Sequence, residues 1–398
     1  MTTTTNNEQK KLNFSSEREQ SQACLNSAEH EKNQGRKVLN VPNLRFPEFQ
    51  GEWEKCTLED VINFSTTRVN SSELNKDNYV STENMLQDYQ GIVKAKSVPE
   101  DVNVVSFSCG DVLISNIRPY LKKVWKATFN GGCSSDVFVL KANDNIESDY
   151  LHYVIANDKF INFVMSGTKG VKMPRGDKKQ METYSLSLPQ IQEQHKIARL
   201  LSLLDERIAT QNKIIDKLQS LIKGIAQKIV RNNKPNVRLA ECLECKSSTL
   251  QESEVCEQGT YPVYGANGIV GYLDNYSMEG EAVYIIKDGS GVGTVSYVTG
   301  KCSATGTLNT LQAKEGYSLQ YFYYLLKVFN FEPYKTGMAI PHIYFKDYGK
   351  AKVFCPSYTE QLQYARLLYA IESKLSIEKK ILTSLSLQKQ YLLRQMFI

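Results

Sequence analysis

The sequence predicts an α+β protein in which two mixed domains of strands and helices are joined by two long helices. The first observation behind this prediction is a gapless internal repeat, in which residues 189–230 and 356–397 align at an offset of 356 − 189 = 167 positions. The second is that apolar residues recur in both copies at alternating spacings of four and three, as in a coiled-coil seam. A chain repeated in this way should have an internal pseudo-twofold relationship, with each mixed domain followed by one long helix.

The two repeated segments have the properties of long, paired helices. Each follows a proline, Pro189 or Pro356, and contains none inside, as expected at a helix start. About 40 residues would span roughly 60 Å at 1.5 Å per residue, which is long for a globular domain. The positions expected to pair the helices are Ile197, Leu201, Leu204, Ile208, Gln211, Ile215 and Leu218 in the first copy and Leu368, Ile371, Leu375, Glu378, Leu382 and Leu385 in the second.

One polar position interrupts both seams. Gln211 stands in the first seam and its 167-residue counterpart Glu378 in the second, each near the middle of its helix. If the helices pair antiparallel about a pseudo-twofold axis, the midpoints meet, and the Gln211 amide can donate to the Glu378 carboxylate. Such a central polar contact commonly fixes the register of a helix pair.

The composition is that of a soluble chain with no obvious membrane segment. The formal charge of +5 permits nucleic-acid binding without requiring it. No window resembles a membrane span, and the polar start lacks the apolar core of a signal peptide, so we expect a cytoplasmic protein. Nine scattered cysteines fit reduced thiols better than a disulfide framework.

The chain divides into five segments. The first is rich in Thr, Asn, Gln, Glu and Lys and poor in large apolar residues, so we expect it to be disordered. Two mixed domains and two long helices follow it. The expected boundaries are 1–40 for the polar extension, 41–188 for the first domain, 189–231 for the first helix, 232–355 for the second domain and 356–398 for the second helix.

The two mixed domains repeat each other in outline. Residues 111–115 and 136–140 are expected to be buried strands, and residues 150–164 an amphipathic helix. The second domain echoes the first at three places, where 280–284 corresponds to 110–114, 302–304 to 133–135 and 320–326 to 150–156. A glycine-containing loop ending in a proline precedes each long helix.

Three short motifs, in this order and with this duplication, resemble the DNA-specificity (S) subunit of type I restriction–modification enzymes. They are Leu44-Arg45-Phe46-Pro47-Glu48-Phe49 with Trp53, the stretch Tyr261-Pro262-Val263-Tyr264-Gly265-Ala266-Asn267-Gly268, and the Pro-x3-Glu-Gln lead into each long helix. The resemblance covers roughly residues 41–398. The polar extension is longer than the family pattern requires, and Tyr364 and Lys389 make the second seam less regular.

The resemblance implies a function as well as a fold. It implies two target-recognition domains that each read half of a split site in double-stranded DNA, and an antiparallel helix pair that docks methyltransferase (M) subunits. It implies a non-catalytic chain without a cofactor of its own. S-adenosylmethionine would come with the M subunits, and ATP and magnesium with a restriction (R) subunit. The alternative is a protein–protein scaffold that never touches DNA, and salt-dependent binding to one split site would distinguish the two.

Cationic and polar residues near loops are the candidate DNA contacts, since phosphates require cations and base edges require amides, hydroxyls or guanidinium groups. The alternative interpretation is that lysines near glycines only form solvated loops. The candidates are Arg118, Tyr120, Lys122, Lys123, Lys169, Lys172 and Arg175 in the first domain and Tyr264, Asn267, Lys287, Ser290, Lys335 and His342 in the second.

Other chemistry finds little support in the sequence. The loop 287–293 matches neither nucleotide-binding fingerprint. Thr294 stands where a dinucleotide site requires its third glycine, and no Gly-Lys-Ser/Thr of a P-loop follows. Cys242 and Cys245 form half of a zinc site at best, because a closed site needs four ligands. The four histidines are dispersed, and there is no methyltransferase or nuclease motif. We therefore expect no metal site and no catalytic residue.

Overall fold

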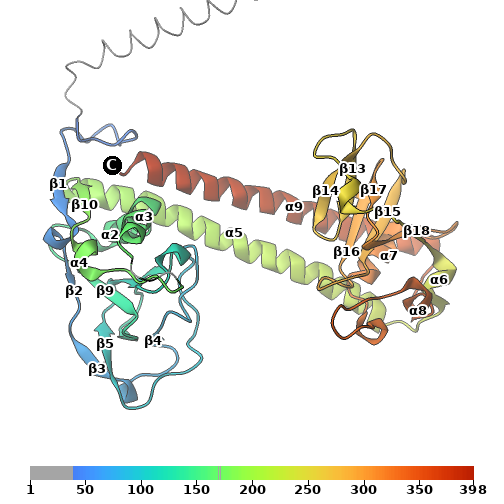
Figure 1. The fold of residues 1–398 in the computed structure, drawn as a ribbon, viewed down its shortest axis with the longest axis horizontal. Helices are drawn as coiled ribbons and strands as arrows, with labels where there is room; N and C mark the ends of the chain where they lie inside the picture. Colours follow the sequence, from blue (N-terminus) through green and yellow to red (C-terminus); the bar gives the residue numbers. More distant parts are fainter. Residues whose placement is uncertain (1–38, 169, 171) are drawn as a thin grey trace, which may run out of the picture. The chain divides into compact units, whose positions relative to one another are not determined.

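The computed structural model describes residues 39–168, 170 and 172–398. The polar extension expected over residues 1–40 lies outside the described residues up to residue 38. The chain forms two compact units, the first reaching to Leu204 and including Gln388–Ile398, and the second comprising Asp205–Leu387. Figure 1 labels many of the helices and strands of both.

The first unit contains three sheets. The main sheet has four strands and is fully antiparallel. Its order is β2 (Ile62–Phe64), β9 (Val137–Ala142), β6 (Val112–Ser115) and β7 (Val124–Lys126). A second sheet has the order β3 (Arg68–Asn70), β5 (Asn103–Phe107), β8 (Gly131–Cys133) and β4 (Tyr79–Val80), with β4 parallel to β8. The third pairs β1 (Glu54–Thr57) with β10 (Ser185–Leu188), so the first and last strands of this domain lie side by side.

Within the described residues, the first unit contains three short helices, and the first of them packs against β6, β7 and β9 of the main sheet. They are α2 (Ser148–Ile155), α3 (Asp158–Ser166) and α4 (Lys178–Glu182), with short 3-10 turns η1 (Leu58–Asp60), η2 (Ser71–Glu73) and η3 (Pro119–Leu121). The single helix expected over 150–164 is therefore wrong, because the chain breaks between Ile155 and Asp158. Asn157 is extended, with φ −127° and ψ 139°, and its side chain caps α3 by accepting from the Lys159 N–H.

The second unit repeats this plan. Its main sheet has the order β12 (Leu243–Ser247), β18 (Leu308–Ala313), β15 (Glu281–Ile286) and β16 (Val295–Thr299), again fully antiparallel. The smaller sheets are β14 (Gly268–Leu273), β13 (Tyr261–Gly265) and β17 (Ser303–Ala304), and β11 (Val237–Arg238) with β19 (Lys352–Val353). Its helices and turns are α6 (Leu239–Cys242), α7 (Leu319–Leu326), α8 (Phe345–Tyr348), η4 (Glu252–Glu254) and η5 (Glu332–Tyr334).

Two long helices, α5 (Ile191–Arg231) and α9 (Tyr358–Gln395), contribute to both units. The start of α5 belongs with the end of α9 in the first unit, and the end of α5 with the start of α9 in the second. The two helices therefore run antiparallel. In the second unit, Ile229 belongs to the buried cluster against which Tyr364 packs, as the antiparallel register requires.

The seam of the second unit contains the predicted polar contact. Gln211 Nε2 donates to the Glu378 backbone oxygen at 3.1 Å and also to its carboxylate Oε2. Both residues are buried, and Lys374 contacts the other carboxylate oxygen, with 2.6 Å between Nζ and Oε1. The Lys374 and Gln211 hydrogen bonds together hold the pKa of Glu378 below its usual value. Every other position expected in the seams is buried or half-buried.

The repeated Pro-x3-Glu-Gln lead joins each long helix to its domain. Gln194 Oε1 accepts from the backbone N–H of Glu147, the N-cap residue of α2, and Nε2 donates to the carbonyl of Pro189. Gln361 does the same for Ser318, the N-cap of α7, and for Pro356. Both glutamines are almost fully buried, so this part of the motif has a structural role.

Candidate nucleic-acid interface

The loop before each long helix is fixed to the end of a central strand. In the first unit, residues 174–176 run antiparallel to residues 116–118, which follow β6. The Arg118 N–H donates to the Pro174 carbonyl at 2.8 Å, and the Gly176 N–H donates to the Asn116 carbonyl at 2.8 Å. We call residues 174–176 the first pinned segment.

The second unit contains the same construction, with its pinned segment 167 positions after the first. Residues 341–343, the second pinned segment, run antiparallel to residues 287–289 after β15. The Gly289 N–H donates to the Pro341 carbonyl at 3.0 Å, and the Ile343 N–H donates to the Lys287 carbonyl at 2.9 Å. The sequence indicated a loop ending in proline in both copies, but not its attachment to the strand.

This attachment imposes a left-handed backbone on equivalent residues. Gly289 has φ +94°, and Arg118 at the matching place has φ +50°. A non-glycine residue in this conformation is strained by roughly 1–2 kcal/mol. Because a glycine is used at the equivalent position, the fold itself does not require an arginine there. Strain retained at a charged, exposed side chain is a feature of functional sites.

Three of the predicted cations in the first domain lie around this attachment. Arg118 is exposed. Partial burial of the Lys123 amine lowers its pKa, and the charge of the nearby Arg118 lowers it further. Lys123 Nζ donates to the carbonyl of Thr82 at 2.6 Å. Arg175 Nη1 lies 2.9 Å from Asp136 Oδ1, and its side chain is 53% exposed. The first pinned segment thus gathers positive charge at one edge of the domain.

The remaining candidates of the first domain are placed differently. Lys122 Nζ pairs with Asp158 of α3 at 2.8 Å and lies 5.9 Å from the centre of the Tyr89 ring, so it has a partner within the fold. Tyr120 and Lys172 are exposed. Lys169 lies outside the described residues.

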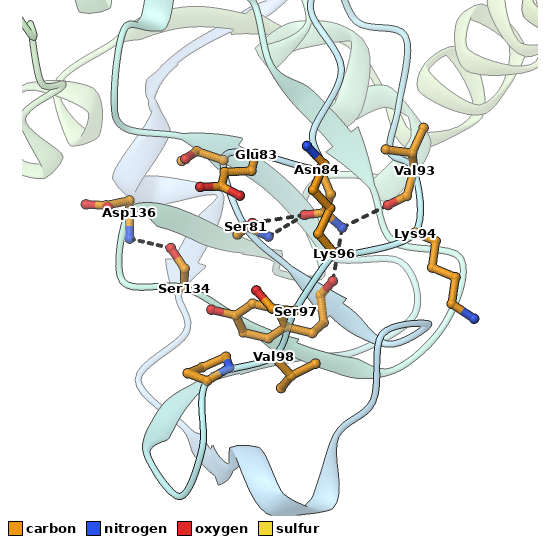
Figure 2. A pocket seen from close by; sticks show the side chains of 13 residues that line it. Ser81, Glu83, Asn84, Val93, Lys94, Lys96, Ser97, Val98, Ser134 and Asp136 are labelled. Atoms are coloured by element: carbon orange, nitrogen blue, oxygen red, sulfur yellow. Dashed lines mark hydrogen bonds between the residues drawn. The ribbon is translucent and has the colours of Figure 1, made fainter.

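A polar cavity of about 340 Å³ adjoins Asp136 and Thr82. Figure 2 shows side chains from the segments 81–84, 93–99 and 134–136 around it. They include hydroxyls, amines and carboxylates, a mixture suited to the edges of bases. None of these lining residues was a sequence candidate, because they come from three separate segments of the chain.

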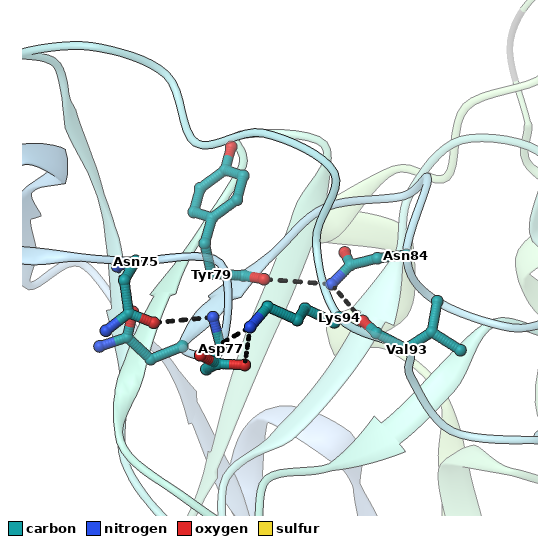
Figure 3. A network of polar contacts seen from close by, with 7 residues as sticks. Asn75, Asp77, Tyr79, Asn84, Val93 and Lys94 are labelled. Carbon is teal, nitrogen blue, oxygen red and sulfur yellow. Dashed lines mark hydrogen bonds and ion pairs between the residues drawn. The ribbon is translucent and has the colours of Figure 1, made fainter.

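Asn84 at the back of this cavity is a structural residue. Its Oδ1 accepts from the Ser81 N–H at 2.6 Å, and its Nδ2 donates to the carbonyls of Tyr79 and Val93 at 3.1 and 2.9 Å. Figure 3 shows the two bonds donated by Nδ2 beside the Lys94–Asp77 ion pair, in which Nζ lies 2.8 Å from Oδ1. Asn84 is 4% exposed, so its bonds shape the cavity and leave recognition to other side chains.

In the second domain, His342 occupies the position of Arg175. Its Nδ1 lies 2.7 Å from Asp288 Oδ1, and both side chains are 34% exposed. Lys287 lies beside the second pinned segment. Ser290, which follows Gly289 in the chain, is exposed. Lys335 pairs with Glu332 at 2.6 Å.

Tyr264 and Asn267 belong to the β13–β14 hairpin. Asn267 is exposed in the turn, whereas Tyr264 lies in β13 with its ring 5.5 Å from that of Tyr284. The structure thus places Tyr264 in a strand that continues to Gly265, whereas Asn267 stands in the turn.

The aspartates Asp136 and Asp288 were missed by sequence reasoning. Each contacts the side chain of the middle residue of a pinned segment, but they come from different loops, Asp136 before β9 and Asp288 after β15. No fixed spacing therefore announces them. The offset of 167 residues that relates Arg175 to His342 is the signal that could have directed attention to this place.

The described part of the chain contains no group of three His, Cys, Asp or Glu side chains able to hold a metal ion. Cys242 is buried and Cys245 half-buried. None of the helices in the described residues has both the length and the apolarity needed to cross a bilayer.

Comparison with known proteins identifies the family. The model of the type I restriction modification DNA specificity domain matches residues 50–220 and 233–387, once for each copy. A putative type I specificity subunit of Mycoplasma genitalium is 24% identical over 371 residues, covering 87% of this chain and 94% of the relative. The EcoDI specificity subunit of Escherichia coli is 27% identical over 124 residues, which is 31% of this chain and only 28% of that subunit.

Solved structures share the fold. The S subunit of a type I restriction–modification system from M. genitalium has a TM-score of 0.64 and 18% identity, covering 90% of this chain and 99% of its own. A chain from a study of complex assembly in a type I system has a TM-score of 0.52 and 17% identity, covering 86% and 96%. With two matched domains and two long antiparallel helices, the chain belongs to the type I restriction–modification DNA specificity family.

Proposed function

We propose that this chain selects a split site in double-stranded DNA for a type I restriction–modification complex, with one half read by each domain. The observation that carries the proposal is the duplicated attachment of a loop to a strand end, since it presents Arg175 and His342 from the same backbone position in two domains. Two copies of one scaffold with different side chains suit the reading of two different half-sites.

Charge supports DNA as the ligand of the first domain. Arg118, Lys123 and Arg175 converge beside a polar cavity, which combines phosphate attraction with groups able to contact base edges. Lys172 adds an exposed amine on the same loop. In the second domain, Lys287 lies beside the second pinned segment, which carries His342.

Exposed apolar residues on the long helices support docking of M subunits. After the seam is filled, Ile377 and Leu387 of α9 remain 53% and 60% exposed, and Leu221 of α5 remains 48% exposed. Large apolar side chains exposed along a helix mark interaction surfaces. We expect Ile377→Glu to reduce copurification of the M subunit, whereas Ser384→Glu, an exposed polar site on the same helix, should not.

The chemistry on DNA would come from the partners. The chain would act without a cofactor of its own, S-adenosylmethionine would be bound by the M subunits, and an R subunit would bring ATP and magnesium. The long helices would set the number of base pairs between the two halves.

Binding and methylation assays test the proposal directly. The complex of this chain with its M subunit should methylate a split sequence, and chromosomal methylation at that sequence should disappear when the gene is removed. Binding to the duplex should weaken steeply as salt rises, because the cations displace counterions from phosphates. A complex that assembles but methylates no split site would contradict the proposal.

A further inference from the structure

The middle residues of the two pinned segments are a matched pair of side chains with different chemistry. Arg175 and His342 are equivalent by the 167-residue offset and by their bridges to Ile117 and Asp288. Each meets an aspartate at hydrogen-bond distance while remaining partly exposed. We infer that Arg175 and His342 are specificity-determining residues, that Arg175 selects a guanine in one half-site, and that His342 selects a base with an exocyclic amino group, adenine or cytosine, in the other.

The geometry around Arg175 fits a guanine. Asp136 engages Nη1, and a guanidinium has five N–H donors in a fixed fork. The remaining donors can form the paired hydrogen bonds with O6 and N7 that distinguish guanine in the major groove. Asp136 thereby acts as a positioning residue, because it restricts a long side chain before DNA arrives and lowers the entropy lost on binding.

The geometry around His342 fits a donor base. A carboxylate oxygen only accepts hydrogen bonds, so Nδ1 carries the proton that lies between the ring and Asp288. In the neutral ring, Nε2 is then an acceptor. Adenine N6 and cytosine N4 present amino donors in the major groove, whereas guanine and thymine present acceptors there. Arg175 would therefore select hydrogen-bond acceptors in one half-site, whereas His342 would select a donor in the other.

The surroundings differ in the same sense. Arg118 and Lys123 lie close to the first pinned segment and add positive charge, which suits the acceptor-rich edge of guanine and the neighbouring phosphates. In the second unit, Gly289 replaces Arg118, and Met338 and Ile340 in the loop before Pro341 are strongly exposed.

The test uses the assembled complex and a panel of duplexes. The wild-type split site is first defined, and each of its base pairs is then replaced in turn while the rate of methyl transfer is measured. Arg175→Ala should reduce the preference for guanine at one position of one half by about 5- to 150-fold, the range expected of a bidentate base contact. His342→Ala should reduce the preference at one position of the other half only.

Two control variants separate base reading from general binding. Lys172→Ala on the same loop should slow methylation of every duplex alike and leave all base preferences unchanged. Arg68→Ala should change neither, because β3 lies at the opposite edge of its sheet from β4, which leads into the cavity. Arg175→Lys keeps the charge but loses the planar fork, so it should lose the guanine preference with a smaller loss of rate.

The inference rests on the proposed function, and the two fail differently. If the wild-type complex methylates no split site, the proposed function is wrong. If it does, but neither Arg175→Ala nor Arg175→Lys alters a preference in either half, the inference is overturned. An altered preference in both halves from one substitution would also overturn it. If Arg175→Ala does not assemble, Arg175→Lys gives the deciding result.

Discussion

The two domains have the same main sheet and the same attachment to the long helices, and they differ in their second sheet. Both main sheets have four antiparallel strands in the same order. In the first domain β8 lies between β5 and β4, whereas in the second β13 lies between β14 and β17 and a tight hairpin joins β13 to β14. The main sheet and the attachment of the pinned segment are therefore the same in both domains, whereas the second sheet differs.

The same contrast exists within the repeated lead into the long helices. Gln194 and Gln361 make equivalent hydrogen bonds to the N-cap residues of α2 and α7. The preceding glutamates differ. Glu193 is almost fully buried and accepts two hydrogen bonds of 2.8 Å from Arg45, whereas Glu360 is exposed and forms a capping box with Ser357. One repeated letter thus has two energetic roles, which makes the pair a sensitive comparison.

The largest expected effect is at Arg45. Its side chain is 16% exposed and that of Glu193 is 1% exposed, so Arg45→Ala leaves a buried carboxylate without its partner. We expect a loss of about 3–5 kcal/mol in the free energy of unfolding, measured by urea denaturation of the unfolding step of the first unit. Ser357→Ala, which removes the capping box in the second copy, should cost only about 1 kcal/mol. Equal losses for the two variants would show that the copies are not different in this way.

Lys196→Ala provides a control for Arg45→Ala. Lys196 lies one turn along the same helix and pairs with Glu48, but both side chains are about half exposed, at 50% and 44%. An exposed pair contributes at most about 1 kcal/mol. A loss in unfolding free energy as large as that of Arg45→Ala would indicate that the whole segment 44–49 has detached from the helix.

An intermediate effect is expected at the two glutamines. Gln194→Ala and Gln361→Ala each leave a backbone N–H of an N-cap residue without its acceptor, which should cost about 1–3 kcal/mol. Because the N-cap and proline contacts are equivalent, the two losses should be similar, each in the unfolding step of its own unit. The remaining Nε2 contacts differ, since Gln194 also donates to the Asn145 carbonyl and Gln361 to Cys355 Sγ. Calorimetry that finds a clear loss in one unit and none in the other would refute the equivalence.

Sequence reasoning succeeded where a feature depends on local spacing. The four-three repeat located both helices, and the 167-residue offset identified Gln211 and Glu378 as the polar pair of the seam. It failed where distant segments converge. Nothing near Arg175 in the sequence indicates Asp136, and nothing near Lys122 indicates Asp158. The break at Asn157 was missed because the apolar pattern continues through it. The pattern does not reveal that the Asn157 side chain caps the start of a second helix.

The smallest expected effect concerns the polar pair of the seam and depends on pH. The hydrogen bonds of Lys374 and Gln211 lower the pKa of Glu378 in the folded chain. A lowered pKa means that this carboxylate stabilises the fold above its unfolded pKa of about 4.3, and that the contribution is lost as pH falls through the folded value. The difference in unfolding free energy between wild type and Glu378→Gln should therefore be larger at pH 7 than at pH 3.

Gln211→Leu sharpens this last prediction. It removes one donor to Glu378 and leaves the Lys374 contact in place, so the pH-dependent part should shrink without vanishing. Replacing Gln211 and Glu378 together with leucine should remove that part entirely and stabilise the pair at pH 7, since well-packed apolar residues commonly outperform a buried polar contact. The polar pair would then serve register rather than stability. A double variant that is less stable than wild type at pH 7 would instead make the pair a net source of stability.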